Sequence, residues 1–248
     1  MATTKSAKVA FITGGNRGIG FETARELGEQ GIEVVLGVRD LDKGLEAVKK
    51  LQARGIRAAA IRFDAEDAAT FQLAHDYFAE KHGKLDILVN NAGVMKEKLE
   101  DGANSSKVST RTLRDTFETN FFAVVALTQV LLPLVRKAPE GRIVNLSSIL
   151  GSLTLHSQPD SPIAFAKAFA YNASKTALNA FTVHLANELK DTPVKVNSAH
   201  PGWVKTDMGG EAAPLEVAEG GKTSAQLALL DSKGSNGAFV HVGQALPW

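Results

Sequence analysis

Tyr171 and Lys175 stand four residues apart in a stretch, residues 164–189, that has the pattern of a helix. Residues i and i+4 share one helical face, so the phenol and the ammonium point toward the same volume. A nearby cation favours the phenolate and lowers the pKa of a tyrosine from its usual value of about 10. Since a general acid works best with a pKa near the working pH, the pair is a candidate proton donor. The competing interpretation is an ordinary surface helix with a half-buried tyrosine and a solvated lysine.

A glycine-rich turn follows the first apolar run of the chain. Residues 8–13 have the pattern of a strand, Gly14, Gly18 and Gly20 come next, and an amphipathic pattern begins at Phe21. A strand, a glycine turn and a helix N-terminus form a phosphate site, because backbone N–H groups and the positive end of the helix dipole face the anion. The spacing is Gly-x-x-x-Gly-x-Gly, which differs from the Gly-x-Gly-x-x-Gly fingerprint. The turn predicts a bound dinucleotide, and the alternative is a tight turn without a ligand.

Two further strand-like runs end in polar groups. Residues 85–93 end in Asn-Asn-Ala-Gly, and residues 142–148 end in Ser147 and Ser148. With the glycine turn, the Tyr-x-x-x-Lys pair and Pro201-Gly202, these motifs stand in one order along nearly the whole chain. In this the chain resembles the short-chain dehydrogenase/reductase family. Within the family it is most similar to the carbonyl reductases, through residues 13–20, 119–122, 201–208, 236–240 and the final tryptophan.

The resemblance implies four catalytic positions, which are Asn120, Ser148, Tyr171 and Lys175. Tyr171 would give a proton to the carbonyl oxygen while a hydride moves from the nicotinamide, and Ser148 would hydrogen-bond the same oxygen. Lys175 would lower the tyrosine pKa and bind the nicotinamide ribose, and Asn120 would hold a water that links the lysine to solvent. Successive side chains of a strand point to opposite faces, so only one of Ser147 and Ser148 can face the site. The resemblance favours Ser148.

The end of the second predicted strand indicates which nicotinamide is used. NAD-dependent enzymes place an acidic residue there for the ribose 2′-hydroxyl, but this chain has Val38, followed by Arg39. Arg39 and Arg17 of the glycine loop would both lie near a 2′-phosphate. Hydrogen bonds to charged groups contribute roughly 1.5–3 kcal/mol, so we expect an approximately 10–100-fold preference for NADPH/NADP+. The alternative for Arg39 is an ordinary solvated pair with Asp40.

The resemblance also assigns the other cofactor contacts. Asp64 and Ala65 would contact the adenine, and Val204 and Thr206 would hold the nicotinamide carboxamide. Asp86 matches a family position that supports strand–loop packing. The full set of predicted cofactor positions is Gly14, Asn16, Arg17, Gly18, Ile19, Gly20, Arg39, Asp64, Ala65, Asn91, Ala92, Gly93, Tyr171, Lys175, Pro201, Gly202, Val204 and Thr206.

The elements that must position these residues alternate regularly. Strand patterns occur at residues 9–13, 33–38, 58–63, 85–91, 142–148, 195–199 and 239–242. Helical patterns occur at residues 21–30, 42–53, 68–81, 112–137, 171–189 and 222–230. Such alternation predicts an α/β fold with a doubly wound parallel sheet and helices on both faces. The resemblance implies a Rossmann-type sheet of about seven strands, in a single domain over residues 1–248 that both binds the dinucleotide and carries the catalytic residues.

Three polar loops, residues 96–110, 150–162 and 207–221, follow strand carboxyl ends, where open α/β sheets bind ligands. They predict a substrate rim, with His156, Ser157 or Gln158 near it. The segment between Ser148 and Tyr171 is longer than in compact family members and shorter than in the carbonyl reductases. The resemblance places an oligomer interface on the helices near residues 112 and 171, which this longer segment can cap, so a homodimer, a homotetramer and a monomer all stay open.

Composition excludes several other classes of protein. The formal net charge is +1, from 28 basic and 27 acidic residues, and no basic run suggests nucleic acid or an anionic membrane as a partner. The chain has no cysteine, which excludes a disulfide framework, a thiolate nucleophile and a thiolate metal site. This fits the expected cytoplasmic location. The six histidines show no metal-binding spacing, so no metal is expected. Residues 121–135 are interrupted by Thr128, Gln129 and Pro133, and no run reaches the ~18 apolar residues of a membrane span.

The sequence thus predicts an NADPH-dependent reductase that converts small ketones or aldehydes to alcohols, reversible as an alcohol dehydrogenase. The chief alternative is a non-catalytic NADP(H)-binding regulatory protein on the same scaffold, since fold does not dictate function. That all four catalytic positions are filled argues against it. An enoyl reductase would space its tyrosine and lysine more widely.

Overall fold

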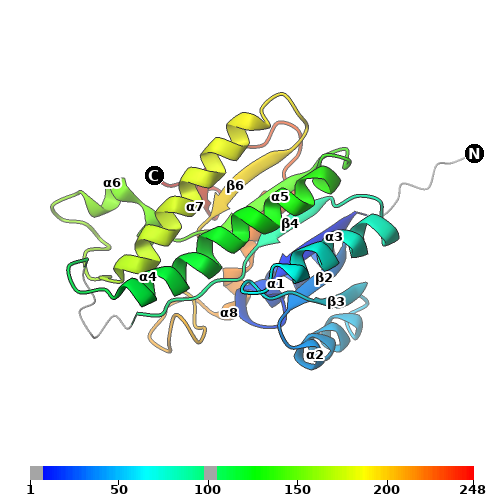
Figure 1. Ribbon diagram of the computed structural model, residues 1–248, viewed down its shortest axis with the longest axis horizontal. Coiled ribbons are helices and arrows are strands. Elements are labelled where there is room, and N and C mark those ends of the chain that lie inside the picture. Colours follow the sequence, from blue (N-terminus) through cyan, green and yellow to red (C-terminus); the bar gives the residue numbers. More distant parts are fainter. Residues whose placement is uncertain (1–7, 98–104) are drawn as a thin grey trace, which may run out of the picture.

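The computed structural model describes residues 8–97 and 105–248. These residues form an eight-stranded β-sheet with helices packed against it (Figure 1). The strand order is β3-β2-β1-β4-β5-β6-β7-β8. All neighbouring strands are parallel except β7 and β8. The strands are β1 (Val9–Thr13), β2 (Glu33–Val38), β3 (Ala58–Arg62), β4 (Ile87–Asn90), β5 (Arg142–Leu146), β6 (Lys195–Ala199), β7 (Phe239–His241) and β8 (Gln244–Ala245). The predicted doubly wound α/β fold is confirmed, with a short antiparallel eighth strand in addition.

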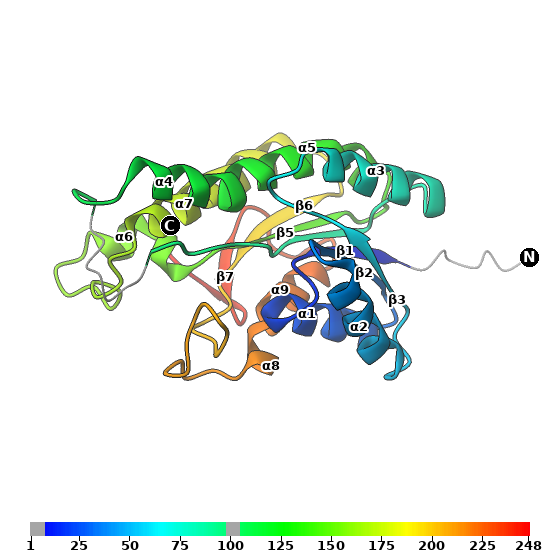
Figure 2. The ribbon, with the colours of Figure 1, turned by 60° about the horizontal axis from the view of Figure 1, so that its bottom comes forward.

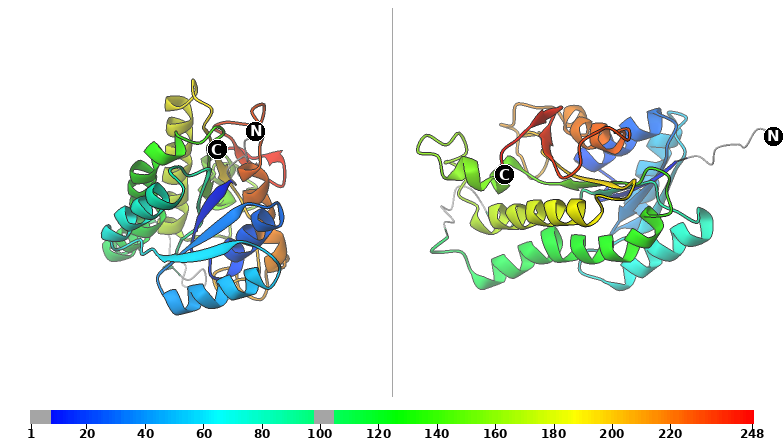
Figure 3. Two further views of the ribbon diagram at one scale, coloured as in Figure 1. Left: turned by 90° about the vertical axis from the view of Figure 1, so that its right-hand side faces the viewer. Right: turned by 90° about the horizontal axis from the view of Figure 1, so that it is seen from above.

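Helices cover both faces of the sheet, as Figures 2 and 3 show. One face carries α1 (Gly18–Glu29), α2 (Leu41–Gln52), α8 (Val217–Gly220) and α9 (Lys222–Ala228). The other face carries α3 (Ala69–Lys81), α4 (Thr110–Phe117), the π-helical turn η2 (Glu118–Phe122), α5 (Ala123–Val135) and α7 (Phe169–Glu188). The chain winds outward from β1 in one direction to β3 and then returns to β4 on the other side of β1. Ligands of such sheets bind beyond the strand carboxyl ends at this reversal.

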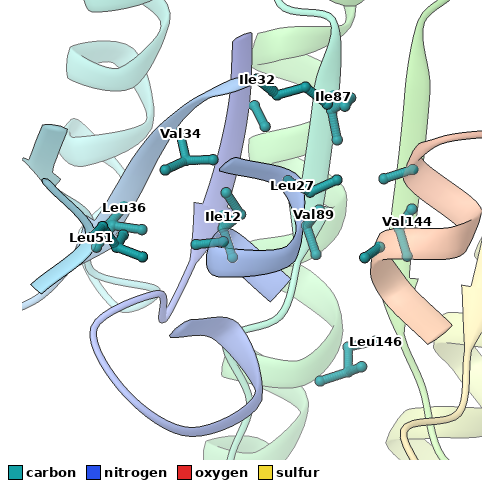
Figure 4. Close-up of a cluster of buried hydrophobic side chains, with 14 of the residues drawn as sticks. Ile12, Leu27, Ile32, Val34, Leu36, Leu51, Ile87, Val89, Val144 and Leu146 are labelled. Atoms are coloured by element: carbon teal, nitrogen blue, oxygen red, sulfur yellow. The ribbon is translucent and has the colours of Figure 1, made fainter. Parts of the chain in front are cut away.

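The core lies on both faces of the sheet because its central strands are buried on both sides. Every residue of β1 is buried. Ile12 faces the cluster under α1 and α2 (Figure 4), whereas Phe11 faces the cluster under α3 and α5. Parallel strands covered on two faces are expected to be apolar throughout rather than alternating. These continuous apolar runs are the pattern from which the sequence predicts the strands.

The structure corrects several predicted boundaries. The helix expected over residues 164–189 begins only at Phe169. The helix expected over residues 112–137 is interrupted by the π-helical turn η2. The short helices η3 (Ile149–Gly151), α6 (Leu153–His156) and α8 were not predicted. Of the three predicted rim loops, the one over residues 96–110 lies partly outside the described residues.

The helical run formed by α4, η2 and α5 is more apolar than the sequence reading allowed. Over its 26 residues, an 18-residue window has a mean hydropathy of 1.5, so by length and composition this run could cross a membrane. The polar residues Thr128 and Gln129 and the helical Pro133 do not break it. Half of the window is buried inside the protein, where Leu127 and Leu131 belong to the core. We therefore interpret its apolar composition as that of a packing helix.

Candidate active site

A cavity of about 610 Å³ opens at the carboxyl ends of the strands, around the point where the strand order reverses. Of the four predicted catalytic residues, Ser148, Tyr171 and Lys175 line it, and Asn120 does not. The predicted rim residues His156, Ser157 and Gln158 are also absent from the lining. Ile163, Phe165 and Ala166 take their place from the same segment. All eighteen positions predicted for the cofactor line the cavity: Gly14, Asn16, Arg17, Gly18, Ile19, Gly20, Arg39, Asp64, Ala65, Asn91, Ala92, Gly93, Tyr171, Lys175, Pro201, Gly202, Val204 and Thr206.

The glycine loop between β1 and α1 is shaped by close backbone approach. Gly14 and Gly18 have φ angles of +65° and +56°, in the left-handed region that favours glycine. A Cβ atom at Gly20 would lie 2.5 Å from Asn91 Nδ2 and 2.5 Å from the Gly14 carbonyl oxygen. Asn91 Nδ2 itself donates to the Thr13 carbonyl at 2.8 Å and so fastens the loop to the segment after β4. The loop and the first turn of α1 thus form a cradle that fits the pyrophosphate of a dinucleotide.

Tyr171 and Ser148 meet from different elements. Tyr171 stands in the first turn of α7, and the Ser148 side chain, just beyond β5, lies near enough to act on the tyrosine hydroxyl and lower its pKa against the larger effect of burial. Ser148 Oγ also accepts from the Leu150 N–H at 3.2 Å, which fixes the serine rotamer. Ser147 Oγ instead donates to the Lys175 carbonyl at 3.5 Å. The alternation along the chain thus directs Ser148, and not Ser147, to the tyrosine hydroxyl.

Lys175 lies one helical turn below Tyr171. Its Nζ is 5.6 Å from the centroid of the tyrosine ring and donates to the Leu146 carbonyl at 2.7 Å. Lys175 and Gly93 both line the cavity, and a Cβ atom at Gly93 would lie in ordinary van der Waals contact with this Nζ, at 3.6 Å. The lysine is therefore placed to face both the tyrosine and a ligand in the cavity.

Burial controls the protonation of this pair. It raises the pKa of Tyr171 to about 12, against the smaller opposing effect of the Ser148 hydrogen bond. Burial also lowers the pKa of Lys175 to about 8. The expected lowering of the tyrosine pKa by Lys175 is not seen in this structure, because burial is the largest effect on the Tyr171 pKa and Ser148 is the group that opposes it. Tyr171 consequently keeps its proton across the physiological pH range, although a pKa of about 12 lies above the working pH at which a general acid is most efficient.

Asn120 lies within η2 and is fully buried. Its Oδ1 accepts from the Val94 N–H at 2.8 Å, and its Nδ2 donates to the Val94 carbonyl at 2.8 Å and to Ser174 Oγ at 3.0 Å. Both amide hydrogens are thus engaged in fixing the segment after β4 against α7. The water expected at Asn120 stays a prediction. π-Helical turns inside α-helices occur frequently at functional sites.

Two arginines line the cavity, Arg17 in the glycine loop and Arg39 after β2. Arg17 forms an ion pair with Asp207 across the cavity mouth, and both side chains are exposed. Arg39 follows β2 and lines the cavity as well. Its neighbour Asp40 uses its carboxylate to cap α2, accepting from the N–H groups of Asp42 and Lys43 at 3.1 and 3.2 Å. This favours a free Arg39 over the alternative Arg39–Asp40 pair.

Part of the cavity wall is apolar. Phe165 and Trp203 face each other with ring centroids 6.5 Å apart, and Ile163 and Met208 line the same region. Phe165 is 63% exposed and Trp203 48% exposed, which is unusual for large aromatic side chains outside an interface or binding site. This wall suits an uncharged ligand with apolar surface.

His200 supports the turn after β5. Its Nδ1 accepts from the Ile149 N–H at 3.3 Å, next to Ser148. Burial, together with the nearby His241, lowers the pKa of His200 to about 3, so the ring stays neutral and can accept this bond. Among the described residues, no group of three or more His, Asp or Glu side chains could hold a metal ion.

Sequence reasoning missed one buried residue beside the tyrosine. Glu97, seven residues beyond β4, is 7% exposed, and its carboxylate accepts from the backbone N–H groups of Ala170 and Tyr171. In the sequence it stands between Lys96 and Lys98, which is typical of a solvated charged loop. No local pattern signals its burial, because its partners are about seventy residues away.

Comparisons with known proteins agree with this geometry. A family model described as short chain dehydrogenase matches residues 8–216. Mouse carbonyl reductase (NADPH) 1 is 30% identical over 283 residues, covering 99% of this chain and 100% of the relative. The (−)-isopiperitenone reductase of Mentha piperita is 32% identical over 308 residues, covering 96% of this chain and 98% of the relative. The solved structure of NADPH-bound carbonyl reductase from chicken fatty liver aligns with a TM-score of 0.84 at 26% identity, covering 98% of this chain and 99% of that one.

Proposed function

Since the chain belongs to the short-chain dehydrogenase family, we propose that it is an NADPH-dependent carbonyl reductase that converts ketones and aldehydes to alcohols. The observation that carries this proposal is that Ser148, Tyr171 and the buried Lys175 line one cavity, with Lys175 Nζ 5.6 Å from the centroid of the tyrosine ring. A regulatory protein that only binds a dinucleotide has no need for a buried proton donor with this support.

The chemistry supplied by bound NADPH is transfer of a hydride to the carbonyl carbon. Tyr171 then gives its proton to the carbonyl oxygen, which completes the alcohol and leaves a phenolate. Ser148 orients the carbonyl by donating to the same oxygen, and its bond from the Leu150 N–H keeps the serine in place. Lys175 carries the positive charge that stabilises the phenolate as it forms.

The preference for NADPH over NADH is assigned to Arg17 and Arg39. Both line the cavity, and Val38 at the end of β2 has no acceptor for a ribose 2′-hydroxyl. A 2′-phosphate would compete with Asp207 for Arg17. Because the Arg17–Asp207 ion pair is exposed, it contributes little stability and its loss costs little free energy. The relatives whose names include NADPH support this assignment.

The substrate is proposed to be an uncharged carbonyl compound with an apolar body. Phe165 and Trp203 offer ring faces beside the cavity, and Met208 adds an adaptable apolar contact. We also keep the cytoplasmic location and the homodimer or homotetramer as predictions. Sedimentation of the purified protein measures the second of these.

The test is oxidation of NADPH, followed by absorbance, against a panel of ketones, aldehydes and quinones, with NADH run in parallel. The proposal predicts turnover of apolar members of the panel and higher kcat/KM with NADPH than with NADH. NADPH binding without turnover of any panel member would favour the regulatory alternative. An equal or higher kcat/KM with NADH would refute the cofactor assignment.

A further inference from the structure

We propose that Glu97 is a positioning residue that holds the first turn of α7 and thereby sets the place of the Tyr171 phenol. The inference rests on the proposed role of Tyr171 as the proton donor. It concerns a contact between two segments far apart in the chain, the loop after β4 and the start of α7.

The contact is bidentate and buried. Glu97 Oε1 accepts from the Ala170 N–H at 3.0 Å, and Oε2 accepts from the Tyr171 N–H at 2.9 Å. Glu97 is 7% exposed, and Ala170 and Tyr171 are buried as well. One carboxylate thus satisfies two consecutive backbone donors, one of which belongs to the tyrosine itself.

The helix needs this contact because it cannot cap itself. The first N–H groups of an α-helix have no partner within the helix, and a Ser, Thr, Asp or Asn at the N-cap usually accepts from one of them. The N-cap of α7 is Ala168, which has no side-chain acceptor. Glu97 therefore supplies from a distant segment what the local sequence lacks.

The energetics favour a strong restraint. A buried carboxylate is costly unless charge-assisted hydrogen bonds compensate it. Here both oxygens accept from N–H groups, at the end of the helix where the dipole favours negative charge. The bonds can persist only while the carboxylate and the helix terminus keep their relative position, so the geometry of the first turn is fixed within narrow limits.

The same loop is fixed at two further points. Asn91 and Ala92 each donate a backbone N–H to Thr13 Oγ1 at 3.0 Å, and the backbone of Val94 is held by Asn120. Residues 91–96 line the cavity. The segment from Asn91 to Glu97 therefore ties the end of β1 to the start of α7, and Tyr171 is positioned relative to the cavity wall rather than by its own helix alone.

The consequence differs along α7. Tyr171 is the third residue of the helix, within the turn that Glu97 holds, whereas Lys175 lies one turn deeper and is held separately by Leu146. Loss of the carboxylate should loosen the tyrosine and leave the lysine in place. A small displacement of a reacting group is enough to lower a rate by about 100-fold.

Glu97→Gln is the matched variant, because glutamine has the same length but only one acceptor oxygen, and its NH2 group would face the second N–H. Asp86→Asn is the control. Asp86 is also a buried carboxylate that accepts a backbone N–H, from Val9 at 2.9 Å, but it lies at the amino end of β4, away from the cavity. Glu97→Asp keeps the charge with a shorter reach and serves if the glutamine variant does not fold.

Two quantities are measured on each full-length variant: kcat and KM with NADPH and the best carbonyl substrate, and hydrogen exchange of the peptide containing Ala170 and Tyr171. We expect E97Q to lower kcat about 10- to 100-fold, to change KM for NADPH less than kcat, and to exchange the two amides faster. E97D should show an intermediate loss. D86N should lower the melting temperature while kcat stays near that of the wild type.

The result that would overturn the inference is unchanged exchange at Ala170 and Tyr171 in E97Q, or faster exchange with kcat unchanged. An equal loss of kcat in D86N would also overturn it, since the effect would then be one of general stability. Failure of the wild type to turn over any substrate would refute the proposed function instead, and the exchange result would still decide whether Glu97 holds the helix terminus.

Discussion

Replacing Lys175 with methionine removes a buried ammonium group while most of the side-chain volume remains. Burial lowers the pKa of Lys175 from 10.5 to about 8 in the folded protein. At about 1.4 kcal/mol for each pKa unit, the charged lysine costs about 3 kcal/mol of stability at neutral pH. The variant also loses the hydrogen bond from Nζ to the Leu146 carbonyl, which contributes about 1 kcal/mol. We expect Lys175→Met to be about 2 kcal/mol more stable than the wild type at neutral pH, and inactive.

The advantage of this variant should depend on pH in a defined direction. Between about pH 8 and 10.5 the unfolded lysine binds a proton and the folded lysine does not, so the wild type gains stability as pH rises through this window. The gap between the two proteins should therefore close at alkaline pH. Groups that lie far from Lys175 titrate equally in both proteins and cancel in the comparison.

The assay is urea unfolding of both proteins at neutral pH and again inside the alkaline window, with the difference in unfolding free energy as the readout. A variant that is less stable than the wild type at neutral pH would refute the reasoning. So would a difference that stays constant as the pH is raised. Either result would mean that the ammonium of Lys175 is stabilised in the folded protein and not penalised by burial.

Three other substitutions test separate parts of the site. Arg39→Ala should raise KM for NADPH about 10- to 100-fold and leave KM for NADH nearly unchanged, because only NADPH loses charged hydrogen bonds. Steady-state kinetics with both cofactors measures this, and an equal change in KM for both would contradict it. Ser148→Ala should lower kcat about 100-fold or more. Ser147→Ala should leave kcat within a few-fold of the wild-type value, because the Ser147 hydroxyl donates to a helix carbonyl. The reverse order would show that the wrong serine was chosen. Gly20→Ala should abolish NADPH binding, because the added Cβ would lie 2.5 Å from Asn91 Nδ2. Fluorescence titration with NADPH measures this, and wild-type affinity would show that the loop can move aside.

Much of the fold was predictable because buried parallel strands are apolar throughout. The observed bounds of β1, β2 and β6 equal the predicted ranges. The start of α7 was less predictable. Residues 164–168 have a composition that suits a helix, but the helix begins at Phe169, where Glu97 from a distant loop caps it. Local sequence cannot reveal a cap supplied over seventy residues away.

The candidate site divides in the same way. The motifs, with the family resemblance that they carry, identified the glycine loop and many of the other residues that line the cavity, but not the apolar Phe165, Trp203 and Met208. They could not give the direction of the Tyr171 pKa, because that depends on burial by the whole fold rather than on the neighbouring Lys175. They also could not show that the Asn120 amide is occupied by Val94, or that a π-helical turn presents it.

The measurement that tests the central claim most directly is turnover by Tyr171→Phe, with NADPH binding measured on the same preparation. The phenylalanine keeps the ring and removes only the proton that the account assigns to the carbonyl oxygen. We predict that kcat falls by at least about 100- to 10,000-fold while the affinity for NADPH stays within a few-fold of wild type. A variant that binds NADPH normally and reduces the same substrate at a rate near wild type would contradict the account, because the proton would then come from another group.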